Sequence, residues 1–139
     1  MRSPREILEN SVTIAVVGAS RHEEKAAYAV PLQLRLHGWH VIPVNPYAQH
    51  IWGARCYPTL ADVPEPIDLV NVFRPSDQAA PIVAQAVAVG AKAVWLQQGI
   101  TTPEGHRIAT EAGLDYVEDR CIAVVRAVER LTRRPPVSP

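Results

Sequence analysis

The chain has 139 residues, a length that suits one domain with a single hydrophobic core. Its hydrophobic content of 47% and charged content of 20% are ordinary for a globular protein and argue against a disordered chain. The formal net charge is zero, which gives no support for a basic face that binds nucleic acid, and no apolar run reaches the roughly 20 residues of a membrane-spanning helix.

The two cysteines, Cys56 and Cys121, stand far apart and outside any pattern of metal ligands, so we expect no structural zinc. The N-terminal residues lack the apolar core of a signal peptide. We therefore expect a cytoplasmic protein that binds neither nucleic acid nor membranes. The sequence leaves the oligomeric state open.

Five short apolar runs alternate with helical patterns along the chain. The runs are mostly continuous in apolar character, which is typical of parallel strands covered on both faces. They are Val12–Val17, Trp39–Val44, Ile67–Phe73, Ala91–Leu96 and Leu114–Glu118.

Helical patterns fill most of the gaps between these runs. Gly90 and Gly113 follow two of them as C-terminal caps, and Pro103 fits the first turn of another. The predicted helices are Ser3–Asn10, one that starts near Tyr28, Ala79–Val89, Thr102–Ala112 and Cys121–Leu131, whereas Arg55–Pro66 is expected to be a loop with one short helical turn.

This alternation predicts an α/β fold, a doubly wound Rossmann-like five-stranded parallel sheet with helices on both faces. Right-handed crossovers favour the strand order 3-2-1-4-5. We expect residues 1–131 to form this single domain. The Pro- and Arg-rich tail 132–139 cannot continue a helix and is expected to be flexible.

Ligands of such sheets bind at the carboxyl ends of the strands, where the strand order reverses, and the loop Gly18–Lys25 follows the first run. Gly18 lets the backbone approach a ligand closely, and exposed N–H groups before a helix favour anionic oxygen. A tight turn is an equally good reason for the glycine. Neither G-x-G-x-x-G nor a P-loop motif is present.

Pro31 indicates where the next helix begins. A proline deep in a helix costs about 3 kcal/mol, whereas one in the first turn is tolerated. The helix is therefore expected to start near Tyr28, which leaves Ala19–Ala27 as a long loop. Such a loop can fold over a phosphate chain, with Arg21 or Lys25 supplying charge, although both also suit a solvated surface.

The second run ends at Asn45 and Pro46, where an NAD site normally has an acidic residue. The neutral Asn45 argues against NAD and is compatible with a ribose that carries a 3′-phosphate. A simple Asn-Pro turn explains the pair equally well.

The residues at the end of the third run can serve either in ligand binding or in the packing, ion pairs and helix capping of the protein. Phe73 lies where an adenine ring can pack, although core packing is the commoner reason for a phenylalanine. Arg74 can contact an anion or form a surface ion pair, and Ser76 is expected to cap the next helix.

The last two runs end in polar residues. Gln97, Gln98 and Gly99 can hydrogen-bond to a ligand that carries amides. Cys121 is either a reactive thiol or a small buried residue. No histidine stands at a recognisable spacing from a nucleophile, so we predict no catalytic residue and no metal ligand.

Five blocks at the strand ends together resemble the stand-alone bacterial CoA-binding proteins, whose fold is similar to the CoA-binding domain of the succinyl-CoA synthetase α subunit. The likeness extends over Ile7–Arg126. The blocks are Val16–Ser20, Gly38–Pro46, Val72–Arg74, Gly90–Gln97 and Asp119–Cys121.

The resemblance implies that Gly18–Ser20 receive the CoA phosphates, that Asn45 and Pro46 border the adenosine with Val72–Arg74 beside it, and that Gln97–Gly99 lie along the cofactor. The predicted cofactor-binding residues are Gly18, Ala19, Ser20, Arg21, Lys25, Asn45, Pro46, Val72, Phe73, Arg74, Gln97, Gly99 and Cys121.

Ligase activity is not implied, because nothing here matches the phosphorylated histidine in the second domain of the synthetase. Ile122–Val125 also replaces the basic, histidine-containing segment of many family members, which puts any role of that segment in doubt.

The resulting hypothesis is non-catalytic binding of coenzyme A or a CoA thioester by a carrier, sensor or presenting module. One alternative is a small NAD(P)-dependent or acyl-CoA-handling enzyme, the latter using Cys121. However, 139 residues leave no room for a substrate domain, and no arginine cluster follows the second run. A subunit that binds no cofactor and serves in protein interaction is the other alternative.

Overall fold

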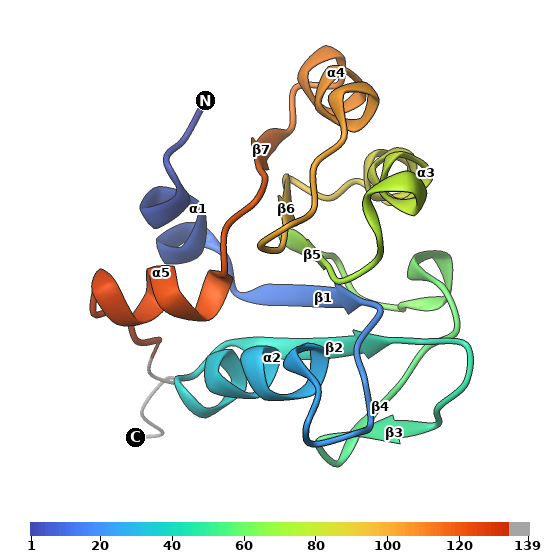
Figure 1. Ribbon diagram of the computed structural model, residues 1–139, viewed down its shortest axis with the longest axis vertical. Helices are drawn as coiled ribbons and strands as arrows, with labels where there is room; N and C mark the ends of the chain where they lie inside the picture. Colours follow the sequence, from blue (N-terminus) through green and yellow to red (C-terminus); the bar gives the residue numbers. More distant parts are fainter. Residues whose placement is uncertain (134–139) are drawn as a thin grey trace.

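The computed structural model describes residues 1–133, in which five parallel strands form one sheet with helices on both faces (Figure 1). The strands of this sheet are β1 (Thr13–Val17), β2 (His40–Val44), β5 (Leu69–Val72), β6 (Ala93–Leu96) and β7 (Asp115–Val117). Outside it lies a two-stranded antiparallel hairpin of β3 (His50–Ile51) and β4 (Ala54–Arg55).

The helices are α1 (Pro4–Asn10), α2 (Ala26–Leu36), α3 (Ser76–Ala88), α4 (Pro103–Glu111) and α5 (Ile122–Val128), with one 3-10 turn, η1 (Leu60–Asp62). Every expected helix is present, with ends shifted by a few residues. Ser76 is not the expected N-cap, because α3 begins one residue earlier: Pro75 is the cap and Ser76 is the first helical residue.

The doubly wound parallel fold is confirmed, but the expected strand order is wrong. The order is β2-β1-β5-β6-β7, or 2-1-3-4-5 counted within this sheet, so the third strand pairs with the first. β2 is therefore an edge strand, and Pro43 is the physical reason. Its carbonyl points away from β1 and accepts the Tyr57 N–H at 3.1 Å, so its missing N–H falls on the side that no strand of the sheet covers.

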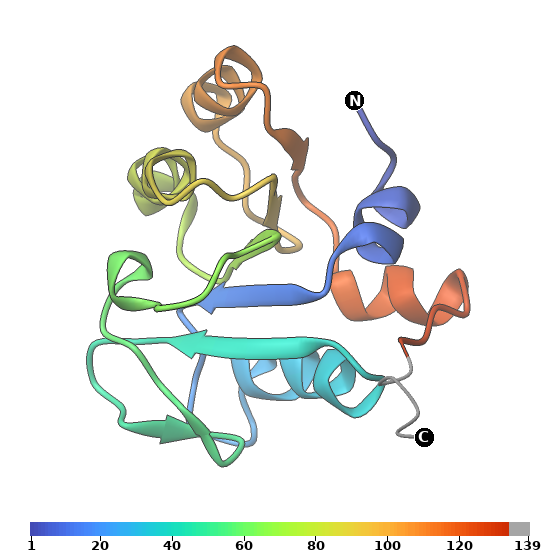
Figure 2. The same ribbon diagram turned by 180° about the vertical axis from the view of Figure 1, so that it is seen from behind.

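Helices α1, α2 and α5 cover one face of the sheet, whereas α3, α4 and η1 cover the other (Figures 1 and 2). Successive residues of β1 alternate between the two cores, with Ile14 and Val16 in the first and Ala15 in the second. Burial on both faces explains the continuous apolar runs. None of the helices within residues 1–133 is long and apolar enough to cross a membrane.

The C-terminal segment is held as far as Arg133. Its N–H donates to the His37 carbonyl at 2.8 Å and its guanidinium to the Glu9 carbonyl at 3.0 Å. The segment crosses Gly38 so closely that a β-carbon there would overlap the Arg133 carbonyl. The expected flexible tail thus includes two residues, 132 and 133, that continue the ordered chain, and its other residues, 134–139, lie outside the described part.

Candidate functional site

Gly18 directly follows β1 at the point where the strand order reverses, and its conformation is set by contacts within the protein. Its φ is +87°, and its N–H donates to the Val44 carbonyl at 3.0 Å. A β-carbon here would lie 2.8 Å from the Phe73 oxygen and 2.9 Å from Cδ of Arg74. The glycine is thus required by the connection that follows β5, whether or not a ligand also approaches it.

Pro31 lies inside α2, where its missing N–H leaves a carbonyl free to bind the β1–α2 loop. The sequence did not predict this link. Helix α2 begins at Ala26 rather than near Tyr28, so Pro31 lies beyond its first turn. Proline has no N–H to donate to the Ala27 carbonyl four residues back. The Ser20 N–H donates to that carbonyl instead, at 3.1 Å.

At the start of the loop, over Gly18–Arg21, two backbone donors remain for an anion. The N–H groups of Ala19 and Arg21 form no hydrogen bond with any group of residues 1–133, whereas Ser20 uses its N–H on α2 and its hydroxyl to accept the His22 N–H at 3.0 Å. The Ala19 side chain is fully buried, so only its backbone can face a ligand.

Asn45 connects this loop to the end of β2. Its Nδ2 donates to the Ala19 carbonyl and its Oδ1 accepts the Tyr47 N–H, both at 2.7 Å. The thiol of Cys56 donates to the Asn45 carbonyl, and burial raises the pKa of that thiol, so Cys56 acts here as a protonated structural residue. Asn45 therefore positions the loop that it borders.

Two adjoining cavities, of ≈ 290 and ≈ 230 Å³, lie at this edge and share Gly18, Asn45 and Tyr47. Together they reach the size of small-molecule sites, about 300–1,000 Å³. The first is also lined by Ala19, Ser20, Arg21, His22 and Ala48, and the second by Pro46 and Arg74.

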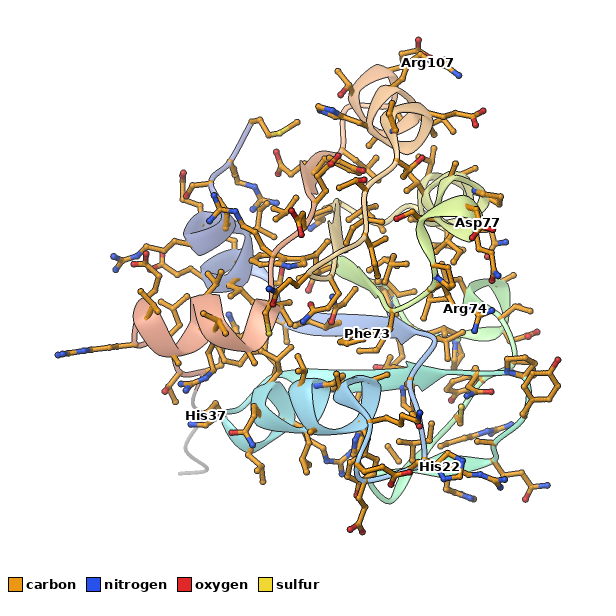
Figure 3. The ribbon with its side chains drawn as sticks, in the orientation of Figure 1. His22, His37, Phe73, Arg74, Asp77 and Arg107 are labelled. Carbon is orange, nitrogen blue, oxygen red and sulfur yellow. The ribbon has the colours of Figure 1, made fainter. Side chains whose placement is uncertain are left out.

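Each cavity has one guanidinium group without a carboxylate partner among the described residues, Arg21 in the first and Arg74 in the second. Nε of Arg74 donates to the side-chain oxygen of Gln78 at 3.2 Å. Figure 3 shows Arg74 beyond the end of β1 and His22 farther along this edge, near the β3–β4 hairpin. Lys25 is exposed and lines neither cavity. Two unneutralised guanidinium groups favour an anionic ligand.

Tyr47 is the aromatic residue that the sequence analysis did not select. Its side chain is 87% exposed and lines both cavities. Phe73, the expected neighbour of an adenine, is only partly exposed and packs against the core beneath α2 and α5. The sequence feature that could have indicated Tyr47 as a ligand-binding residue is its position directly after Asn45 and Pro46, at the end of an edge strand.

The remaining predicted residues line neither of the two cavities. Val72 is fully buried under α3, so its side chain cannot reach a ligand. At the ends of β6 and β7, Gln97 Oε1 accepts the Ile122 N–H at 3.2 Å, and the Gly99 N–H donates to Asp119 at 2.7 Å. Cys121 is the partly buried N-cap of α5.

Comparison with known proteins identifies the same type of domain. Residues 12–127 match the family described as CoA binding domain. The uncharacterized protein YneT of Bacillus subtilis is 34% identical over 126 residues, 91% of this chain and 93% of YneT.

Solved structures agree with this match. A hypothetical protein from Pyrococcus horikoshii OT3 is 40% identical, with a TM-score of 0.87 over 92% of this chain and 89% of that one.

By sequence, an ADP-forming acetate–CoA ligase of Archaeoglobus fulgidus is a more distant relative. It is 28% identical over 116 residues, which are 82% of this chain and 16% of the ligase.

Proposed function

The chain belongs to the CoA-binding domain family, and we propose on this basis that it binds coenzyme A or a CoA thioester without transforming it. The observation that carries the proposal is the pair of adjoining cavities, each with an unneutralised guanidinium group. CoA has two anionic centres, the diphosphate and the 3′-phosphate, which suit two separate cations.

The diphosphate is assigned to the first cavity. There the N–H groups of Ala19 and Arg21 have no partner among residues 1–133, and the Arg21 side chain adds charge. Backbone donors ahead of a helix stabilise anionic oxygen. Asn45 supports this arrangement by holding the Ala19 carbonyl turned toward β2.

The adenosine is assigned to the second cavity, between Tyr47 and Arg74. The exposed ring of Tyr47 offers a face for the adenine, and the Arg74 guanidinium can pair with the 3′-phosphate. Asn45 stands where an acidic residue would repel that phosphate, and its amide is already used by backbone partners.

The pantetheine arm is assigned to the carboxyl edge of the sheet. From β1 to β7 the edge crosses three strand spacings, about 14 Å at about 4.8 Å each. The arm has a backbone as long as about four peptide residues, about 14 Å when extended. It can therefore reach Gln97, Gly99 and Cys121, which line neither of the two cavities.

The proposed role is to carry, sense or present the cofactor. The groups assigned to the phosphates of CoA are backbone N–H groups and guanidinium groups, which bind anions as hydrogen-bond donors. Both cysteines are unpaired, which fits a reducing compartment such as the cytoplasm.

Calorimetry with CoA, dephospho-CoA and NAD tests the proposal. We expect CoA to bind, dephospho-CoA to bind about tenfold more weakly, and NAD to give no heat. Arg74→Gln should abolish the difference between CoA and dephospho-CoA. The control is Arg107→Gln on α4, far from the cavities (Figure 3), which should preserve it. Tight NAD binding without CoA binding would overturn the assignment of the ligand.

A further inference from the structure

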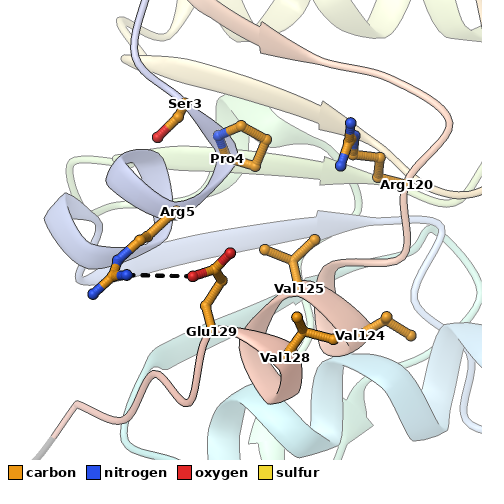
Figure 4. A pocket seen from close by; sticks show the side chains of 8 residues that line it. All are labelled: Ser3, Pro4, Arg5, Arg120, Val124, Val125, Val128 and Glu129. Atoms are coloured by element: carbon orange, nitrogen blue, oxygen red, sulfur yellow. Dashed lines mark hydrogen bonds and ion pairs between the residues drawn. The ribbon is translucent and has the colours of Figure 1, made fainter.

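A groove of ≈ 540 Å³ lies between α1 and α5, separate from the two cavities of the β1–α2 loop (Figure 4). Its apolar side consists of Val124, Val125 and Val128 of α5 and Pro4 of α1. Val124 is 56% exposed and Val128 is 72% exposed. Two large apolar side chains in one groove are not explained by the hydrophobic core, which they do not enter.

One end of this groove meets the edge to which the pantetheine arm is assigned. Arg120 lines the groove and directly precedes Cys121, the N-cap of α5. The next N–H, of Ile122, donates to Gln97 at the end of β6, and Asp119 accepts the Gly99 N–H. The groove thus begins at the loops where the thiol of a bound CoA would arrive.

We infer that the groove receives the acyl group of a CoA thioester, which lies along α5 with its thioester near Arg120. The inference rests on the proposed function and names its ligand class, an acyl-CoA with an apolar chain of medium length. Arg120 has no carboxylate partner within residues 1–133, so its guanidinium is available to the thioester carbonyl oxygen.

The length of the groove determines how long an acyl chain it can hold. Val128 lies seven positions beyond Cys121, which is about 10 Å of helix at 1.5 Å per residue. An extended chain advances about 1.2 Å per bond, one third of a peptide residue. About eight carbons therefore span the groove.

The far side of the groove favours an uncharged acyl chain. Arg5 forms ion pairs with both Glu9, at 2.8 Å, and Glu129, at 3.3 Å across the groove (Figure 4). Because its charge is already neutralised, Arg5 offers no free cation for an acyl group that ends in a carboxylate.

Calorimetry with CoA, acetyl-CoA and octanoyl-CoA tests the inference. Since each methylene removed from water adds affinity, octanoyl-CoA should bind at least about tenfold more tightly than acetyl-CoA. In the double variant Val124→Gln/Val128→Gln the ratio of the two affinities should fall to near one. The matched control is Leu36→Gln on α2, an exposed leucine outside the groove, which should keep the wild-type ratio.

A chain-length series on the wild-type protein gives a second readout that needs no variant. Affinity should rise up to about eight carbons and then level off, as the estimated groove length requires. If CoA and octanoyl-CoA bind equally, the inference is wrong and the proposed function remains. If neither binds, the proposed function itself is wrong. A concentration-dependent dimer in sedimentation, dissociated by the double variant and indifferent to acyl length, would make the groove an interface between copies and overturn the inference.

Discussion

Gly18 and Gly90 both have positive φ, +87° and +78°, but their surroundings differ. A β-carbon at Gly90 would meet no atom within 4 Å, whereas at Gly18 it would press on the Phe73 carbonyl. We expect Gly90→Ala to lower the free energy of unfolding by about 1 kcal/mol and Gly18→Ala by about 3 kcal/mol, because a steric clash adds to the backbone strain. Urea denaturation checks both values, and equal costs would contradict the close approach at Gly18.

Tyr47 is the residue on which the placement of adenine depends. Tyr47→Ala should weaken CoA binding about tenfold, in line with the 1–3 kcal/mol typical of a stacked base, whereas Tyr47→Phe keeps the ring and should bind as wild type. The measurement is a calorimetric titration of each variant. Wild-type affinity in Tyr47→Ala would mean that the adenine lies elsewhere.

The sequence predicted which residues border the cavities more accurately than it predicted the contacts that these residues make. Gly18, Asn45 and Arg74 were found because the ends of parallel strands meet at one edge. The role of Asn45 was not predictable, since its partner, the Ala19 carbonyl, lies 26 residues away. The burial of Val72 was readable, because it shares a face with Val70 by strand alternation.

At the scale of elements, the hydrogen bond between the Ser20 N–H and the Ala27 carbonyl ties the β1–α2 loop to helix α2. Pro31→Ala would restore a helical N–H that competes for this carbonyl. We expect the Ser20 amide to exchange with solvent at least about tenfold faster in this variant, because it shares its acceptor. Amide exchange followed by NMR measures the effect.

The control for this prediction is Pro81→Ala. Pro81 is also inside a helix, α3, on the opposite face of the sheet. It should leave the exchange of Ser20 unchanged. Unchanged exchange in Pro31→Ala as well would show that the proline does not maintain the link between loop and helix.

The two prolines show what local sequence can and cannot predict about elements. Pro43 lies within a strand, and its missing N–H was a readable sign that β2 is an edge. Pro31 was placed in a first turn because an interior proline leaves a carbonyl without its donor. The donor that compensates, Ser20, comes from outside the helix, and local periodicity does not reveal such a partner.

At the scale of the molecule, Arg2 and Asp115 join the N-terminal segment to β7. Nε of Arg2 lies 2.6 Å from Oδ2 of Asp115, and the Arg2 N–H donates to Oδ1 at 3.0 Å. Burial of Asp115 opposes its ionisation, but the bonds from Arg2 outweigh this effect and hold the pKa of the carboxyl below its ordinary 3.8. The pair therefore stabilises the fold above that pH, and its contribution is lost as the pH falls through the lower folded value.

Arg2→Ala should lower the free energy of unfolding by about 1 kcal/mol near neutral pH. The difference from wild type should shrink as the pH falls below 3.8 and Asp115 becomes protonated. Denaturation across this pH range measures it, with Arg107→Ala, which breaks an exposed pair with Glu111, as the variant of smaller effect. A difference independent of pH would contradict the role of the ion pair.

The wrong strand order does not change which strand end is the predicted switch point. In the expected and the observed orders alike, β1 stands where the order reverses, so its carboxyl end is the switch point. The observed order changes the neighbour of β1, because β5 now lies directly beside it. This adjacency brings Arg74 into the cavity that Gly18 and Asn45 border.

We propose that this chain binds CoA at the β1–α2 loop. The most direct measurement is a titration of ¹⁵N-labelled protein with CoA, followed by amide chemical shifts. We predict saturable shifts at Ala19, Arg21, Tyr47 and Arg74, with amides of α3 and α4 beyond their first turns unchanged. Shifts confined to another face, or none at saturating CoA, would contradict the claim.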